Sequence, residues 1–286
     1  MKVLIFNQHP DCSLYVWKAM TDLGFNVEFA TEDLTLNLGF PYSATKKNRF
    51  EVVNKSFSPE EFSETFSNVR FVNEANHDLY LSISPKVFDI FKEKCLWDVR
   101  MQFFMKHLGH LPCRKVCNHP SAEKYGFKFC SNWVPPQKNS DVDPFLITQL
   151  IIECNLVSET VELIKLRRRN FPVVIAGGRN SRDGFVRDRD VLPYTSLLVH
   201  NKQFGINCYA VCKALDLGIL VYMSRFTKES IGFGDLPDDL FLFKEDYSIE
   251  QAYKISLSSD RKKKQEIYRS IYTLERTKKT LMDCLR

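Results

Sequence analysis

The chain has 286 residues, of which 44% are hydrophobic and 13% aromatic, and it carries a formal net charge of +5. This composition excludes a globally disordered protein, and no apolar run reaches the roughly 18 residues of a membrane span. Nine cysteines, an odd number in a large chain, are typical of reduced thiols rather than of a disulfide framework. We therefore expect a cytoplasmic protein, whose mild basic excess permits an anionic ligand without requiring nucleic acid.

The first half of the chain alternates predicted strands and helices. Residues 2–6 predict a strand, Ser13 can cap a helix that stops at Gly24, and residues 26–30 predict the next strand. A strand–helix–strand opening implies parallel pairing. Further strands are predicted at 50–53, 78–84, 115–118 and 127–130, and helices near 58–62 and at 86–94.

The second half repeats this alternation after a polar, proline-bounded segment, residues 132–141, which we interpret as an interdomain linker. Residues 146–152 are apolar and suit either a strand or part of a longer helix. Strands are predicted at 172–176, 196–200, 219–222 and 240–243, and helices at 158–169, at 206–217, from 248, and as one long charged helix over 260–285. The pattern predicts an α/β fold of two Rossmann-like domains, 1–135 and 136–286, facing each other across a cleft.

Glycine is scarce, and seven of the 11 glycines lie between Gly177 and Gly234, which points to a ligand site in the second half. The segment 200–207 follows a predicted strand and opens a helix, where parallel sheets bind ligands and helix N-termini favour phosphate. Its side chains add a positive charge and amides that suit phosphate or hydroxyl oxygens. The predicted donor-binding residues here are Asn201, Lys202, Gln203, Gly205 and Asn207. The alternative is an ordinary connection with solvated polar residues.

A second segment with anion-binding character begins at Gly177-Gly178 and also follows a predicted strand. Four arginines within eleven residues suit phosphate, because guanidinium pairs with it through two hydrogen bonds. We favour Gly178 and Arg179, the residues at the turn, as part of the donor site. Interleaved aspartates at 183, 188 and 190 leave open a self-neutralising surface loop instead.

Three residues in the first half are candidate catalytic groups. His9 or Asp11, in the loop after the first strand, can act as general base toward an acceptor hydroxyl, although Asp11 can instead orient His9 or cap the first helix. His119 also follows a predicted strand. With Cys113 and Cys130 it suggests a zinc site, but the spacing lacks a Cys-x-x-Cys pair and favours buried free thiols.

Basic runs at Arg167–Arg169 and Arg261–Lys264 are typical of helix ends and solvated helix faces, and can also contact an anionic polymer. The chain lacks a Walker-type Gly-x-x-x-x-Gly-Lys, a Gly-x-Gly-x-x-Gly after its first strand and a Gly-x-Ser-x-Gly. A dinucleotide oxidoreductase is therefore disfavoured.

In the order of these motifs the chain resembles glycosyltransferases of the two-Rossmann, GT-B type. The features that carry the resemblance are MKVLIFNQHPD, the bend Asn132-Trp133-Val134-Pro135, VVIAGG, SLLVHNKQFGIN and a closing charged helix. The resemblance implies that a nucleotide sugar binds mainly to the second domain and a hydroxyl acceptor, such as a glycan, to the first. It places the diphosphate near Arg179, Gly205 and Asn207 and the base at His9 or Asp11. It also implies a hexosyl- or pentosyltransferase without a metal ion or other cofactor, because side chains and a helix N-terminus neutralise the leaving diphosphate.

The chain departs from this family in one motif and in its length, which is short for the class. Many retaining members carry two glutamates seven residues apart around the donor helix, whereas here Gln203 stands near the first position and residues 206–217 contain no glutamate. The retaining or inverting outcome is left open. In size the chain is similar to compact viral and phage glycosyltransferases, including those that act on modified DNA bases. Two alternatives stay open: transfer to DNA, suggested by Arg167–Arg169 and the basic run from Arg261, and a non-catalytic nucleotide-binding scaffold, suggested by the missing glutamates.

Overall fold

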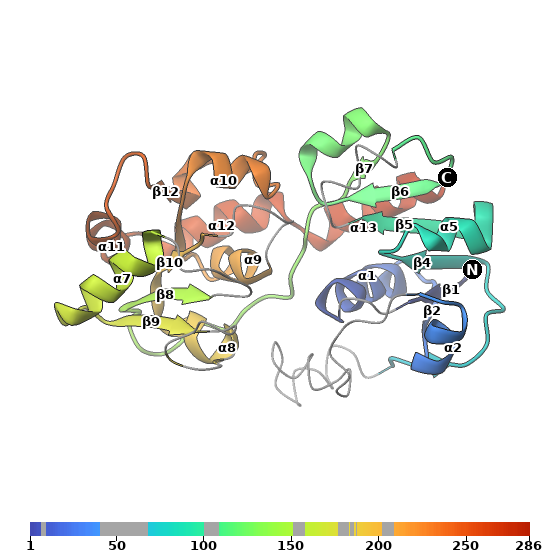
Figure 1. Cartoon of the computed structure of the whole chain (residues 1–286), viewed down its shortest axis with the longest axis horizontal. Coiled ribbons are helices and arrows are strands. Elements are labelled where there is room, and N and C mark those ends of the chain that lie inside the picture. The colour runs from blue at the N-terminus through green and yellow to red at the C-terminus, as the bar shows by residue number, and fades with distance from the viewer. Residues whose placement is uncertain are drawn as a thin grey trace. The chain divides into compact units, whose positions relative to one another are not determined.

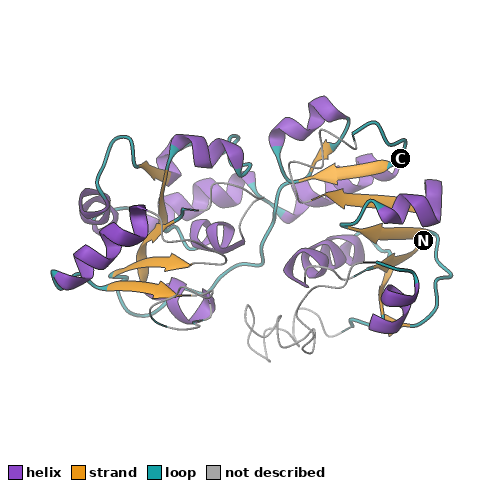
Figure 2. Cartoon of the chain, viewed as in Figure 1, coloured by secondary structure: helices purple, strands orange, loops and turns teal. Residues whose placement is uncertain are grey.

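The computed structural model describes residues 1–6, 10–40, 68–99, 109–150, 158–176, 183, 186, 188–201 and 209–286. It divides the chain into two compact units (Figure 1). Unit 1 comprises Met1–Trp133 and Leu274–Arg286, and unit 2 comprises Val134–Thr273. Each unit has a parallel sheet with helices packed on it, so the predicted α/β class is confirmed (Figure 2).

The sheet of unit 1 has the strand order β3-β2-β1-β4-β5-β6-β7. Its strands are β1 (Lys2–Ile5), β2 (Asn26–Ala30), β3 (Phe71–Val72), β4 (Leu79–Ser82), β5 (Cys95–Val99), β6 (Arg114–Cys117) and β7 (Lys128–Phe129). All neighbouring strands pair in parallel. The chain builds outward from β1 to β3 and then returns to place β4 on the other side of β1. The strand order therefore reverses between β1 and β4, which is the topological switch point of a Rossmann-type sheet.

Helices α1 (Pro10–Asp22), α2 (Glu32–Asn37), α5 (Lys86–Phe91), η1 (Lys92–Lys94), η2 (Pro120–Tyr125) and α13 (Leu274–Leu285) complete unit 1. Helix α1 begins three residues before the predicted cap, Ser13, because Pro10 suits a first helical position. Aromatic stacking is prominent in the core, where the rings of Phe6 and Phe40 lie 4.2 Å apart and those of Tyr80 and Phe91 lie 3.7 Å apart.

The sheet of unit 2 has the order β12-β11-β10-β8-β9, again with parallel pairs. Its strands are β8 (Leu146–Leu150), β9 (Val173–Ala176), β10 (Thr195–Val199), β11 (Leu220–Met223) and β12 (Phe241–Phe243). The ambiguous apolar run at 146–152 is thus a strand in its described part. Because the chain adds β9 on one side of β8 and β10 on the other, the switch point of this sheet lies between β8 and β10.

The helical elements of unit 2 are α7 (Ser158–Arg168), α8 (Asp188–Val191), η3 (Leu192–Tyr194), α9 (Tyr209–Asp216), α10 (Arg225–Ser230), η4 (Asp238–Leu240), α11 (Ile249–Leu257) and α12 (Arg261–Ile271). Helices α7 and α11 bury apolar side chains against one face of the sheet, with Leu163 and Ile249 fully buried. Helix α9 packs against β11, and α12 packs against α9. No helix in the described ranges is both long and apolar enough to cross a membrane.

The predicted single helix over 260–285 is two helices. The break follows α12 at Tyr272, whose backbone leaves the helical region with φ −99° and ψ 78°. The Tyr272 ring is buried, and its hydroxyl donates a hydrogen bond to Asp235 Oδ1 at 2.8 Å, which anchors the end of α12 in unit 2. The charged, helix-favouring sequence continues through this point, so periodicity alone does not reveal the break.

Residues 274–286, which the sequence analysis placed in the second domain, lie in unit 1. Helix α13 packs on α1 and β6, where Leu281 is fully buried and Thr277 Oγ1 donates to the Ser131 carbonyl at 3.3 Å. The units divide between Trp133 and Val134, two residues before the predicted boundary at 135. The predicted elements at 50–53 and 58–62 lie outside the described residues.

Candidate active site

The switch point of unit 2 is the place where a parallel sheet of this order binds ligands. Strand β10 ends there at Val199, and the His200 amide donates to the Tyr222 carbonyl at 2.9 Å, which extends the ladder with β11 by one residue. Asn201, half-buried, comes next. The other donor-site predictions in this segment, Lys202, Gln203, Gly205 and Asn207, lie outside the described residues. The segment that carries them nevertheless connects the switch-point strand to α9.

Helix α9 is held firmly in unit 2. All of its residues are buried, and its last residue, Asp216, accepts two hydrogen bonds from Arg269 of α12, at 2.7 and 2.9 Å. The Gln137 amide donates to the same carboxylate at 2.7 Å. A bidentate guanidinium–carboxylate pair fixes direction as well as distance. The C-terminal end of α9 is therefore fixed, and its N-terminal end follows directly from the predicted donor segment.

A buried ion pair joins α9 to the segment after β9. The Lys213 side chain is 1% exposed, and its ammonium lies 3.2 Å from Asp188 Oδ2 at the start of α8. Burying an ammonium is costly unless a counter-charge accompanies it. The pair therefore ties together the segments that follow β9 and β10, the two segments to which the sequence assigns donor binding.

Asp183 anchors the arginine-rich segment to the sheet. Its carboxylate accepts a hydrogen bond from the Ile175 amide at 2.8 Å and pairs with Arg167 of α7 at 2.7 Å. Gly178 and Arg179 lie outside the described residues. Asp183 and Asp188 thus pair with Arg167 of α7 and Lys213 of α9, and Asp190 lies 3.6 Å from Arg189.

The switch point of unit 1 lies between β1 and β4. The chain leaves β1 at Phe6, whose amide donates to the Leu81 carbonyl of β4 at 2.9 Å, so this exit lies directly beside β4. His9 lies outside the described residues. Asp11 is the second residue of α1, so its backbone belongs to the first helical turn.

His119, the third catalytic candidate, lies at the N-cap of η2 after β6. It is 5% exposed, and its Nδ1 accepts a hydrogen bond from the Ser121 amide at 3.2 Å and lies 2.7 Å from Ser121 Oγ. One ring nitrogen is thus used to cap the turn. A catalytic proton transfer by His119 requires its other nitrogen.

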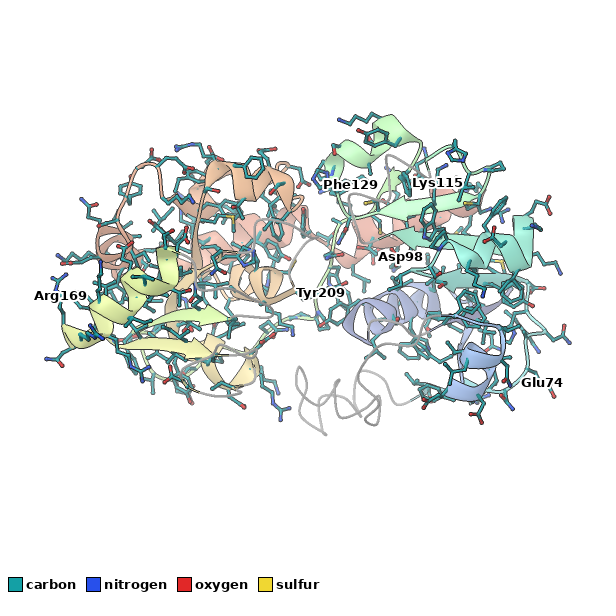
Figure 3. The ribbon with its side chains drawn as sticks, in the orientation of Figure 1. Glu74, Asp98, Lys115, Phe129, Arg169 and Tyr209 are labelled. Atoms are coloured by element: carbon teal, nitrogen blue, oxygen red, sulfur yellow. The ribbon has the colours of Figure 1, made fainter. Side chains whose placement is uncertain are left out.

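The sequence analysis missed Asp98, which is 3% exposed near the carboxyl end of β5 (Figure 3). Buried aspartates are rare unless they are paired. Ser82, fully buried at the end of the neighbouring β4, accepts a hydrogen bond from the Ser84 amide at 3.0 Å. The sequence feature that could have pointed to Asp98 is a single acidic residue inside the apolar run Cys95-Leu96-Trp97-Asp98-Val99. The strand that contains this run was not predicted.

A cavity of about 530 Å³ lies along the edge strand β12. Both acidic and basic side chains line this cavity. Among them, Arg225 forms a bidentate pair with Asp246, with N–O distances of 3.1 and 2.7 Å. None of the predicted site residues lines this cavity. It is therefore not the donor site that the strand order favours.

The thiols and the histidine named for the zinc alternative all lie in the described part of the chain. Cys117 and Cys130 are buried, and the described residues contain no group of three or more His, Cys, Asp or Glu side chains able to hold a metal ion.

Comparison with known proteins identifies the architecture. No protein-family model matches the sequence, and no curated protein is detectably similar to it. Among solved structures, sucrose-phosphate synthase from Thermosynechococcus elongatus is similar with a TM-score of 0.60 at 11% identity, over 99% of this chain and 98% of that one. The glycosyltransferase of kitacinnamycin is similar with a TM-score of 0.55 at 8% identity, over 100% and 98% of the two chains.

The chain has the GT-B fold. A third similar structure is a mutant of TarM from S. aureus in complex with fondaparinux, α-GlcNAc-glycerol and UDP. The TM-score is 0.55 at 9% identity, and the match covers 73% of this chain but only 55% of TarM. The family resemblance inferred from motif order is thus confirmed at the level of the fold.

Proposed function

We propose that the protein is a glycosyltransferase that moves a hexosyl or pentosyl group from a nucleoside diphosphate sugar to a hydroxyl acceptor. One observation carries the proposal. In each unit, one of the segments that the sequence assigns to the site, after β1 in unit 1 and after β10 in unit 2, follows a strand at the switch point of the sheet, the position that binds ligands in such sheets. The similarity to GT-B structures along the whole chain supports the same reaction class.

The donor would bind to unit 2 through its diphosphate. The amide groups before α9 and the side chains of Lys202 and Arg179 supply positive potential, and Asn201 supplies an amide for hydroxyl or phosphate oxygens. These groups neutralise the charge that develops on the departing diphosphate. A bound metal ion is then not required, which makes the proposed reaction metal-independent.

The acceptor would be activated by unit 1. His9 or Asp11 accepts the proton of the acceptor hydroxyl, whose oxygen forms a bond to the anomeric carbon while the bond from that carbon to the diphosphate oxygen breaks. A glycan or a polyol is the acceptor class we favour, since α-GlcNAc-glycerol accompanies UDP in the similar TarM structure.

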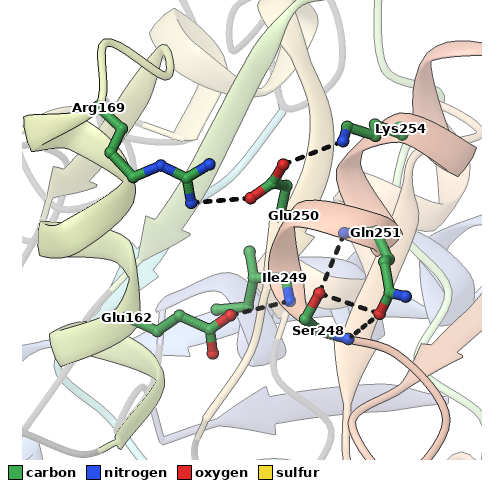
Figure 4. Close-up of polar contacts among 7 residues, drawn as sticks. All are labelled: Glu162, Arg169, Ser248, Ile249, Glu250, Gln251 and Lys254. Carbon is green, nitrogen blue, oxygen red and sulfur yellow. Dashed lines mark hydrogen bonds and ion pairs between the residues drawn. The ribbon is translucent and has the colours of Figure 1, made fainter.

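Transfer to DNA has less support. The hypothesis rests on the Arg167–Arg169 cluster and on the basic run from Arg261, and two of the three clustered arginines are paired with carboxylates. Arg167 pairs with Asp183, and Arg169 donates to Glu250 at 2.8 Å (Figure 4). Hydrogen bonds from Lys254 and Arg169 lower the pKa of Glu250, which keeps it ionised opposite these cations. Arg167 and Arg169 thus make contacts within unit 2.

Thermal unfolding with a panel of nucleoside diphosphates and their sugars tests the proposal. A ligand at about 100 times its Kd adds about 2.7 kcal/mol of stability, which raises Tm by roughly 5 °C or more in a domain of this size. We expect this rise with at least one diphosphate, unchanged by EDTA. Lys202→Ala should reduce it, whereas Lys262→Ala, an exposed lysine of α12, should not. No rise with any nucleotide would refute the donor assignment.

A further inference from the structure

Two cysteines of unit 1 lie side by side at the start of neighbouring strands. In the parallel register of β5 and β6, Leu96 pairs with Arg114, so the preceding residues Cys95 and Cys113 lie opposite each other. Adjacent strands are about 4.8 Å apart, which is within the roughly 4.4–6.8 Å range of Cα separations in disulfides. Each thiol is close enough to the other to perturb its pKa.

The two thiols differ in access and in acidity. Cys113 is partly exposed, whereas Cys95 is fully buried. The hydrogen bond from Cys95, followed by the charge of Lys115, lowers the pKa of Cys113, against the opposing effect of burial. The hydrogen bond to Cys113 and burial raise the pKa of Cys95. The accessible sulfur is therefore the one that favours the reactive thiolate form.

The surroundings of Cys113 are basic and fixed. The Lys115 ammonium is held close to the strand by hydrogen bonds to the carbonyls of Gly109 and Leu111. Its neighbour Arg114 donates to the Glu93 carbonyl at 2.8 Å. An electropositive, partly exposed position next to a second thiol is the environment that distinguishes reactive cysteines from inert buried ones.

The other described cysteines lack this combination. Cys117, Cys130 and Cys212 are buried. Cys284 is partly exposed, but burial raises the pKa of its thiol, and its Sγ lies 3.9 Å from the Lys115 carbonyl. The pair at 95 and 113 is thus set apart from the thiols around it.

We propose that Cys113 and Cys95 form a peroxide-sensitive dithiol, with Cys113 as the attacking sulfur and Cys95 as the resolving one. The Cys113 thiolate attacks one oxygen of hydrogen peroxide, the O–O bond breaks, and the departing hydroxide takes a proton to leave as water. Cys95 then attacks the sulfur of the resulting sulfenic acid, and its thiol proton leaves with the hydroxyl as a second water. Two thiols and one peroxide thus give one disulfide and two waters. The disulfide links the amino ends of β5 and β6.

Mass spectrometry of the intact, folded protein tests the proposal. After treatment with excess hydrogen peroxide, quenching and alkylation, we expect one cross-linked peptide pair containing Cys95 and Cys113, lighter by two hydrogen atoms and restored by dithiothreitol. Tm should rise on oxidation, because the cross-link restrains the unfolded chain. In Cys95→Ser, Cys113 should stop at a dimedone-reactive sulfenic acid. Cys284→Ser, the matched control, should form the disulfide as the wild type does.

A second measurement on the wild type does not depend on whether Cys95→Ser folds. With limiting iodoacetamide, Cys113 should be alkylated about tenfold faster than Cys284, because thiolate character sets the rate. The proposal is overturned if Cys284 reacts as fast as Cys113, or if peroxide leaves the 95–113 pair unlinked in the folded wild type.

Discussion

At the scale of single residues, the most informative feature is the buried ion pair between Lys213 of α9 and Asp188 in the segment after β9. Lys213 is 1% exposed within α9, and Asp188 lies 3.2 Å from its ammonium. A buried lysine in a helix that packs on a sheet is costly, so its presence at this place indicates a role in holding the two segments together. The sequence alone did not reveal this pairing, because 25 residues separate the partners.

Asp188→Asn removes the counter-charge and leaves the Lys213 ammonium buried. We expect a loss of about 2–4 kcal/mol in the free energy of unfolding, somewhat below the range for fully buried pairs because Asp188 is partly exposed. The double variant Lys213→Met/Asp188→Asn should recover much of this loss, since it removes the buried ammonium together with its counter-charge. Urea unfolding measures both values. A double variant less stable than Asp188→Asn would contradict the account.

Gly218 and Gly24 provide a second residue-scale test. Both have positive φ, +71° and +83°, and a Cβ at Gly24 would meet nothing within 4 Å, whereas one at Gly218 would collide with the backbone carbonyl of Arg261. Gly24→Ala should therefore lower the free energy of unfolding only by the cost of a left-handed backbone at a residue with a Cβ, about 1–2 kcal/mol. Gly218→Ala should cost clearly more, because the start of α12 must shift. Equal losses in urea unfolding would show that α12 does not approach α9 so closely.

At the scale of elements, the alternation of strands and helices was largely predictable, because buried parallel strands are short apolar runs bounded by turn residues. The strand at residues 26–30 was predicted with its observed limits. Strand β5 was missed because Asp98 interrupts its apolar run. Helix α10 was missed although Ser224 caps it, with its side chain accepting a hydrogen bond from the Thr227 amide at 2.9 Å.

The association of α13 with unit 1 is testable through its buried face. Leu281 is fully buried, so Leu281→Ala should cost about 2–5 kcal/mol. Leu257, at the end of α11, is 52% exposed, and Leu257→Ala should change stability by less than about 0.5 kcal/mol. In Leu281→Ala, hydrogen exchange should show reduced protection of the backbone amides of β6 and α1 rather than of those of β10 and β11. Reduced protection in β10 and β11 instead would show that α13 stabilises unit 2.

At the scale of the whole molecule, two parallel sheets of different strand order are built from one chain that crosses between units at Trp133–Val134 and at Thr273–Leu274. The sequence predicted two such domains because alternation is a local property. It did not predict the strand order or the return of α13, because both depend on contacts between distant residues. The candidate site was predictable only in part. The sequence showed which polar segments follow strands, but not which of these strands lie at a switch point, because that depends on the strand order.

Release of nucleoside diphosphate tests the central claim most directly. The protein is incubated with a panel of nucleoside diphosphate sugars and glycan acceptors in excess EDTA, and the products are separated by chromatography. The account predicts diphosphate release from at least one donor, reduced about 100-fold or more in the Arg179→Ala/Lys202→Ala variant and unchanged in Lys262→Ala. No release from any donor, or release that survives the double replacement, would contradict it.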